Sequence, residues 1–285
     1  MPFFKSILSL IRVKQWLKNL MIFFPPFLGG TLFQTGVAEK GVAPFVAFCL
    51  ASSATYIIND ITDISCDRQH PLKQKRPIAS GLIKVGSAKF LASTLMLTSL
   101  VIAIGSSRTL LLLLLSYLVI SNAYSFSLKN IPVVDLFCIS SGFLIRLLAG
   151  GAAFSVKVSE WLFLSVLLLS LFLSTGKRLG EKSALGDCPC DHRKVLDAYP
   201  DGFLDGILYM TGASVLVTYA MYAVSRHSSL LLATVVVCSF GLIRYVFMVK
   251  SGKGGDPTES LLQDKPLLLT GILWTAMIGW GLYGR

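Results

Sequence analysis

Long apolar runs separated by short polar segments dominate the chain. Runs such as 110–120 lack the regular alternation of polar and apolar residues that transmembrane barrel strands require. Because lipid offers the backbone no hydrogen-bond partners, membrane-crossing segments of this kind are helices. We predict an all-α, polytopic membrane protein with about nine spans. They lie at residues 20–36, 42–58, 86–105, 108–126, 132–154, 160–176, 205–225, 229–249 and 266–284.

Composition agrees with this pattern. Hydrophobic residues make up 54% of the 285 positions and charged residues only 14%, whereas about 25% charged residues is usual in a soluble domain. We therefore expect one integral membrane domain over residues 1–285. An amphipathic segment, Phe4 to Lys18, precedes the first predicted span, and we expect it to lie in the membrane interface.

The basic residues are distributed unevenly between the two sides of the predicted membrane domain. Of the 26 lysines and arginines, 19 fall in the N-terminal segment and in the loops after even-numbered spans. The positive-inside rule places that side in the cytoplasm. The two longest polar stretches, 59–85 and 177–204, share this side, and we expect them to cap an active site. Basic residues in short loops are typical of membrane topology and anionic ligands, so we expect no nucleic-acid partner despite the net charge of +11.

A stripe of oxygen-bearing side chains follows the second predicted span. Tyr56, Asn59, Asp60, Asp63 and Asp67 share one helical face if the helix continues to Asp67. Carboxylate and amide oxygens suit Mg²⁺, which takes few protein ligands together with waters and substrate phosphates. We expect the asparagine and the three aspartates to hold Mg²⁺ with a diphosphate. The alternative is a solvated acidic cluster balanced by the lysines that follow.

Basic residues come directly after this stripe. Lys73 and Arg76 lie between Pro71 and Pro77, which stiffen the loop, and both suit the binding of phosphate oxygens. Ordinary cytoplasmic positive charge would explain either residue alone. It does not explain their position next to the carboxylates.

Arg146 lies inside the fifth predicted span, where a charge is costly. We expect it to face a cavity and to bind an anionic ligand. The alternative is a structural pair with an acidic side chain, and Asp135 lies three turns away on the same face. Lys18 and Lys129, at the ends of spans, are weaker phosphate candidates because either charge alone fits a role in topology.

The motif N-D-x-x-D-x-x-x-D, at residues 59–67, resembles the first metal-diphosphate motif of the UbiA superfamily of intramembrane prenyltransferases. That resemblance implies nine helices around a central cavity. Further motifs are similar to the decaprenyl-phosphate 5-phosphoribosyltransferase branch of the superfamily. They are R-x-x-Q-W-x-K-N from Arg12, D-R-x-H-P-x-K-x-x-R-P-I-A-S-G from Asp67, Y-S-x-x-L-K from Tyr124, G-F-x-x-R-x-x-A-G from Gly142, K-R-x-G-E from Lys177 and G-D-P-x-E from Gly255.

One departure separates this chain from the prenyl-diphosphate users of the superfamily. Those proteins carry a second D-x-x-x-D cluster in the later cytoplasmic loop, where this chain has K-R-x-G-E. Asp187 and Asp191 keep the spacing, but Gly186 and Pro189 disfavour a helix there. A single metal site with surplus cations favours phosphoribosyl transfer over prenyl transfer.

The resemblance implies a Mg²⁺-dependent enzyme of a bacterial cytoplasmic membrane, with its active site facing the cytoplasm. It would move 5-phosphoribose from phosphoribosyl diphosphate (PRPP) to a polyprenyl phosphate and release diphosphate. We expect Asp60, Asp63 and Asp67 to be catalytic, and Asn59 with Asp63 to contact the metal directly. The substrate-binding candidates are Lys18, Tyr56, Lys73, Arg76, Lys129, Arg146, Lys177 and Arg178.

Two other functions fit parts of the pattern. A UbiA-type prenyltransferase with a polyprenyl diphosphate donor and an aromatic acceptor would share the first motif. A transporter of anionic metabolites would use an in-span arginine as counter-ion, but it predicts broken helices at the membrane midplane. The number of subunits is left open, a homo-oligomer included.

Three other features receive structural interpretations. We expect Arg244 to extend its side chain to the interface. Cys188, Cys190 and His192 lack a fourth zinc ligand at a recognisable spacing. We expect the segment 251–260 to be a loop without a binding role.

Overall fold

The structure is a computed structural model that describes residues 2–69, 73–184, 194–252 and 256–284. Every regular element in these ranges is a helix, as predicted. Eight helices are long and apolar enough to cross a membrane, and they match eight of the predicted spans. They are α3 (Val42–Thr62), α5 (Val85–Ser106), α6 (Arg108–Phe126), α7 (Val134–Phe154), α8 (Glu160–Ala184), α10 (Phe203–Ser225), α11 (Ser229–Lys250) and α13 (Lys265–Tyr283).

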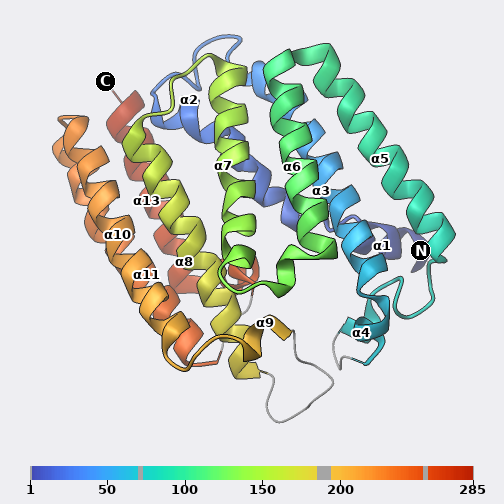
Figure 1. Ribbon diagram of the computed structural model, residues 1–285. Coiled ribbons are helices and arrows are strands. Elements are labelled where there is room, and N and C mark those ends of the chain that lie inside the picture. Colours follow the sequence, from blue (N-terminus) through green and yellow to red (C-terminus); the bar gives the residue numbers. More distant parts are fainter. Residues whose placement is uncertain (1, 70–72, 185–193, 253–255, 285) are drawn as a thin grey trace.

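The prediction of one helical span at 20–36 is wrong. The chain instead forms a 3₁₀ segment, η1 (Val13–Phe23), followed by the short helix α2 (Phe24–Leu28). A 3₁₀ helix rises about 2.0 Å per residue and an α-helix about 1.5 Å, so the two together extend about 30 Å, the thickness of the hydrocarbon core. Figure 1 shows this segment running obliquely from one end of the bundle to the other. The crossing is therefore made with an extended, irregular helix.

The predicted amphipathic segment 4–18 is also divided. Helix α1 (Pro2–Leu10) ends before Arg12, which adopts a left-handed conformation (φ 52°), and η1 begins directly afterwards. Leu10 is buried with Ile57 of α3 and Ile78 of the following loop. This packing holds α1 against the C-terminal end of α3.

The short helices mark one end of the bundle, which we call the polar end. Helices α1, α4 (Ile64–Gln69) and α9 (Lys194–Asp197) lie there, whereas α2 lies at the opposite end (Figure 1). The short segments η3 (Lys73–Lys75), η4 (Leu128–Asn130) and α12 (Pro257–Gln263) follow α4, α6 and α11. The polar end therefore carries the residues that the sequence marks as chemical candidates.

The outer faces of the long helices are apolar. Phe90 on α5, Val236 on α11 and Trp280 on α13 are each more than 70% exposed. Large apolar side chains on the outside of a bundle are stable in lipid and costly in water. The helices and their exposed faces identify an integral membrane protein.

A glycine lets η1 pack closely against α7. A Cβ atom at Gly150 would lie 2.1 Å from the carbonyl oxygen of Ile22. Small residues allow this kind of close backbone approach between membrane helices. Asn19, three residues before Ile22, is fully buried and donates to Cys49 Sγ (3.1 Å) on α3. Thus η1 lies between α3 and α7.

We expect Gly150→Ala to destabilise the protein by about 1–3 kcal/mol, because the added methyl group overlaps with a backbone atom that has little room to move. The measurement is thermal unfolding of the purified protein in detergent. Gly105→Ala on α5 is the matched control, since a Cβ there meets no atom within 4 Å. Equal stability of the two variants would contradict the close packing of η1 on α7.

Candidate active site

A cavity of about 900 Å³ opens among η1, α3, α6, α7, α8, α12 and α13. Arg12, Lys18, Tyr56, Asn59, Arg146 and Lys177 supply polar atoms to its wall. Apolar side chains line another part of it, from Leu17, Leu20, Met21 and Phe24 on η1 and α2 and from Leu268 and Ile272 on α13. The cavity therefore combines a polar wall with an apolar one.

The acidic stripe follows one nearly continuous helical path. Helix α3 ends at Thr62 and α4 begins at Ile64, yet the Asp63 amide donates to Asn59 O (2.9 Å) and the Asp67 amide donates to Asp63 O (2.8 Å). The turn at Asp63 deviates only locally from helical geometry. The backbone path expected from the spacing is thus present, with a small break.

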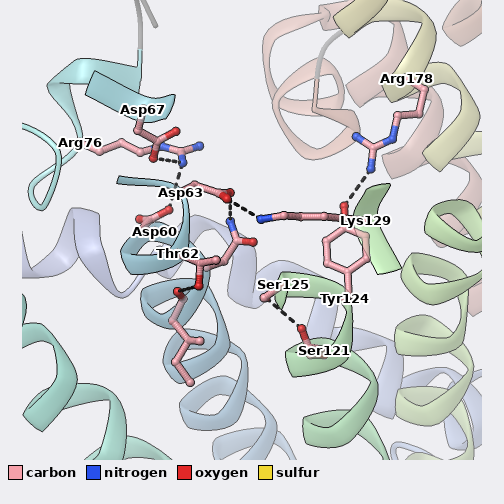
Figure 2. A network of polar contacts seen from close by, with 12 residues as sticks. Asp60, Thr62, Asp63, Asp67, Arg76, Ser121, Tyr124, Ser125, Lys129 and Arg178 are labelled. Carbon is pink, nitrogen blue, oxygen red and sulfur yellow. Dashed lines mark hydrogen bonds and ion pairs between the residues drawn. The ribbon is translucent and has the colours of Figure 1, made fainter. Parts of the chain in front are cut away.

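Two of the expected metal ligands face arginines. Arg12 donates to Asp60 Oδ1 at 2.5 Å, and Arg76 donates to the same atom at 3.1 Å. Arg76 also donates to Asp67 Oδ2 at 2.6 Å (Figure 2). Asp60 and Asp67 are both buried, and neither lines the cavity. In this structure their charges hold Arg12 and the loop of Arg76 against α3 and α4.

Asp63 and Asn59 form a second contact group. Lys129 of η4 pairs with Asp63 Oδ1, and Asn59 Nδ2 donates to Asp63 Oδ2 at 3.1 Å (Figure 2). The other polar atom of the Asn59 side chain, Oδ1, is buried and has no hydrogen-bond partner among the residues that the structure describes. A buried acceptor without a partner calls for an explanation, such as an absent ion. Since Asn59 also lines the cavity, this oxygen is available to a cation bound there.

The four expected ligands do not converge on one point. Among the described residues, no group of three histidine, cysteine, aspartate or glutamate side chains lies close enough to hold a metal ion. The arrangement fits a Mg²⁺ ion that has few protein ligands and whose coordination shell is completed by water and phosphate oxygens. Asn59 and Asp63 are the pair that fits this description.

Arg146 lies in the cavity wall and is 5% exposed. Its Nε donates to Asn19 Oδ1 (2.6 Å), its Nη1 to Gly142 O (2.7 Å) and its Nη2 to Tyr117 Oη (3.3 Å). The guanidinium also lies 4.6 Å from the centre of the Tyr117 ring. In the described part of the chain no carboxylate pairs with it. Its charge is therefore solvated by dipoles and an aromatic face, and it attracts anions into the cavity.

Arg178 has a different role from the one expected. It is fully buried and donates to Asp135 Oδ2 (2.6 Å), Glu181 Oε2 (2.6 Å) and Tyr124 Oη (2.8 Å). Tyr199 also donates to Asp135, at 2.6 Å. Asp135 thus pairs with Arg178 on α8, and the alternative partner of Arg146 is excluded. Arg178 does not line the cavity, so these contacts favour a structural role, and its binding of substrate stays a prediction.

The remaining candidates are placed as follows. Lys18, Tyr56 and Lys177 line the cavity, whereas Lys73 begins η3 outside it. Arg244 pairs with Asp264, with Nη2 to Oδ2 at 2.8 Å. The cysteine pair with His192, and the second aspartate pair at 187 and 191, lie outside the described residues.

Asp256 belongs to the G-D-P-x-E motif, but the sequence alone predicts none of its contacts. Its Oδ2 lies 3.7 Å from Lys18 Nζ and 3.4 Å from Lys177 Nζ, and its Oδ1 accepts from the Thr258 amide at 3.0 Å. Burial alone would raise the pKa of Asp256, but the two lysines outweigh burial and hold that pKa below its usual range. An aspartate directly before a proline at the first helical position indicates a helix N-terminus. The expectation of a plain loop at 251–260 was wrong here.

Comparisons with known proteins agree with these features. The model of the UbiA prenyltransferase family matches residues 23–270. The chain is 33% identical over 294 residues to the decaprenyl-phosphate phosphoribosyltransferase of Mycolicibacterium smegmatis, with 98% of this chain and 92% of that protein covered. It is 33% identical over 281 residues to the enzyme of that name from Mycobacterium tuberculosis, with 96% and 93% covered.

A UbiA homologue from Archaeoglobus fulgidus, solved with GPP and Mg²⁺, has a similar structure. It superposes with a TM-score of 0.71 at 18% identity, covering 98% of this chain and 100% of that one. This likeness establishes a shared fold.

We expect Arg178→Gln to destabilise the protein by about 3–5 kcal/mol, since it leaves the Asp135 carboxylate buried without its cation. Arg244→Gln is the matched control, because the arginine of its pair with Asp264 is one-third exposed, and we expect a much smaller loss of stability. Thermal unfolding of both variants in detergent is the measurement. A stable Arg178→Gln protein with impaired substrate binding would restore the binding role.

Proposed function

This chain belongs to the UbiA prenyltransferase family, and we propose that it transfers 5-phosphoribose from PRPP to a polyprenyl phosphate, releasing diphosphate. Its similarity to decaprenyl-phosphate phosphoribosyltransferases over nearly the whole length supports this reaction. The observation that carries the proposal is the division of the cavity wall. Asn59 lines the cavity and contacts Asp63, and four cations, Arg12, Lys18, Arg146 and Lys177, line the same cavity. Two phosphorylated substrates require both oxygen atoms that bind a metal ion and cations that bind phosphate.

The donor side consists of Asn59, Asp63 and the cations beside them. Asn59 Oδ1 and the Asp63 carboxylate would hold Mg²⁺, which neutralises diphosphate charge when bound. Lys129, already beside Asp63, supplies positive charge to diphosphate oxygens. Arg76 and Lys73 lie on the adjoining loop, and the buried Asp60 and Asp67 orient Arg76. Tyr56 lines the cavity, and Arg12 Cζ lies over its ring, 4.9 Å from the ring centre.

The chemistry requires little from the protein beyond placement and charge. The bond between ribose C1 and the diphosphate oxygen breaks, and a new bond forms between C1 and an oxygen of the lipid phosphate. Positive charge develops on the ribose ring while negative charge grows on the diphosphate, so the surrounding cations lower the barrier. The acceptor phosphate is an anion at neutral pH. It therefore needs no general base.

The acceptor side lies where the cationic and apolar walls meet. Lys18 and Arg146 hold the lipid phosphate, and Lys177 reaches it from α8. Leu17, Leu20 and the α13 side chains extend the cavity with an apolar surface that fits a polyprenyl tail. The basic loops favour a cytoplasmic position of the polar end in a bacterial cell, where PRPP is soluble. The segments 59–85 and 177–204 would then cap the site.

A transfer assay tests the reaction. Purified protein receives Mg²⁺, PRPP labelled in the ribose and decaprenyl phosphate, and label is expected in the lipid fraction. A parallel reaction contains a polyprenyl diphosphate and an aromatic acceptor. Activity in the second reaction with none in the first would replace the proposal by prenyl transfer.

We expect Asp63→Asn to lower kcat by about a hundredfold or more, because it removes the only negative charge from the two side chains that suit the metal. The comparison variant is Asp205→Asn, whose carboxylate pairs with Lys250 on α11 and does not line the cavity. Both proteins are assayed for phosphoribosyl transfer at saturating substrate, with thermal unfolding as a check of folding. Full activity of Asp63→Asn would remove this residue from the site.

A further inference from the structure

We propose that Asp256 is a positioning residue that holds Lys18 and Lys177 together as a single binding site for the phosphate of the lipid acceptor. The inference deepens the proposed function, because it assigns this lysine pair to the acceptor and not to PRPP. It rests on three features of the structure: the convergence of the two lysines, the fixed orientation of the carboxylate, and the surface beside them.

The two lysines come from distant parts of the chain. Lys18 belongs to η1 and Lys177 to α8, and both line the cavity. Two ammonium groups at one point repel each other, and burial strengthens the repulsion. A single carboxylate oxygen, Asp256 Oδ2, lies within 4 Å of both nitrogens. Asp256 therefore offsets the cost of bringing the two cations together.

The orientation of the carboxylate is fixed by the backbone. Asp256 caps α12, with Oδ1 accepting from the Thr258 amide at 3.0 Å. This leaves Oδ2 directed at the lysines. The side chain is only 16% exposed, and Thr258 and Ser260 are buried behind it. The carboxylate is thus part of a rigid contact between α12, η1 and α8.

Asp256 is placed behind the lysines and not in front of them. The two lysines, Pro257 and Thr258 line the cavity, but Asp256 does not. Each ammonium group has several donor hydrogens, so those not directed at Asp256 remain available to a ligand. A carboxylate in this position holds the two lysines in place without occupying the ligand position.

The surroundings of the lysine pair select the lipid. Leu17 and Leu20, beside Lys18 on η1, line the cavity, as do Leu261 of α12 and Leu268 of α13. A phosphate on this pair therefore has an apolar surface next to it. That suits a phosphate monoester of a hydrocarbon chain. PRPP would place ribose hydroxyls there without hydrogen-bond partners.

Asp256→Asn is the test variant, because asparagine also caps helices and has nearly the same shape, so it removes mainly the charge. We expect the Kd for decaprenyl phosphate, measured without donor, to rise about tenfold, the equivalent of one lost charge-assisted hydrogen bond. Binding of decaprenol, which has the tail without the phosphate, and the KM for PRPP should stay within about twofold of the original protein.

Asp264→Asn is the matched control. Asp264 also caps a helix, accepting from the Leu267 amide, and pairs with a cation, Arg244, but this cation does not line the cavity. Asp264→Asn should leave the Kd values for decaprenyl phosphate and decaprenol unchanged. Asp256→Ser, a second capping residue without charge, covers the case in which Asp256→Asn does not fold.

A second comparison separates positioning from a general structural role. In a Lys18→Met, Lys177→Met background, Asp256→Asn should no longer change decaprenyl phosphate binding. An equal effect in both backgrounds would overturn the proposal, as would unchanged or tighter phosphate binding in the single variant. An increase in the PRPP KM alone would also overturn it and assign the lysines to the donor. The measurements of decaprenyl phosphate and decaprenol binding do not use turnover, so they stand apart from a failure of the transfer assay.

Discussion

The hydrogen bond between Arg146 and Asn19 is the contact on which the shape of the cavity depends. A guanidinium in the middle of a membrane helix costs about 3 kcal/mol or more unless polar groups surround it. Asn19 supplies an oxygen at 2.6 Å, and Tyr117 supplies a hydroxyl and a ring face. Asn19 reaches Arg146 because η1 crosses as an extended 3₁₀ segment beside Gly150. The same crossing carries Lys18 into the cavity wall.

Charge compensation organises the rest of the polar end. Asp60 and Asp67 bind Arg76, Asp63 binds Lys129, and Asp256 lies between two lysines. The contacts of Asp63 and Asp256 join elements that are distant in sequence, so the contacts that balance charge also assemble the site. Arg178 does the same for α8, α7 and the segment after α9 through Asp135 and Tyr199. Substrate phosphates and Mg²⁺ would enter an arrangement in which opposite charges are already close together.

Much of this fold follows from the sequence, because long apolar runs leave only the helix as a membrane structure. The first crossing was not predictable in the same way, since an apolar run does not distinguish an α-helix from a 3₁₀ segment that packs on Gly150. The acidic motif predicted the helical path from Asn59 to Asp67. It did not predict that Arg12 and Arg76 form ion pairs with two carboxylates of the motif. Those contacts link residues 48 and 16 positions apart. The contacts of Asp256 were not predictable, because its partners, Lys18 and Lys177, come close to it only in the folded bundle.

The central claim is that Asn59 and Asp63 form a donor site that is separate from the lipid-phosphate site at Lys18, Arg146 and Lys177. The most direct measurement is the binding of PRPP to the purified protein without lipid acceptor, in the presence of Mg²⁺ and in the presence of a chelator. The account predicts that PRPP binds only with Mg²⁺, and that Asn59→Ala weakens this binding while decaprenyl phosphate binds as before. Equal PRPP affinity with the chelator, or a loss of both ligands in Asn59→Ala, would contradict it.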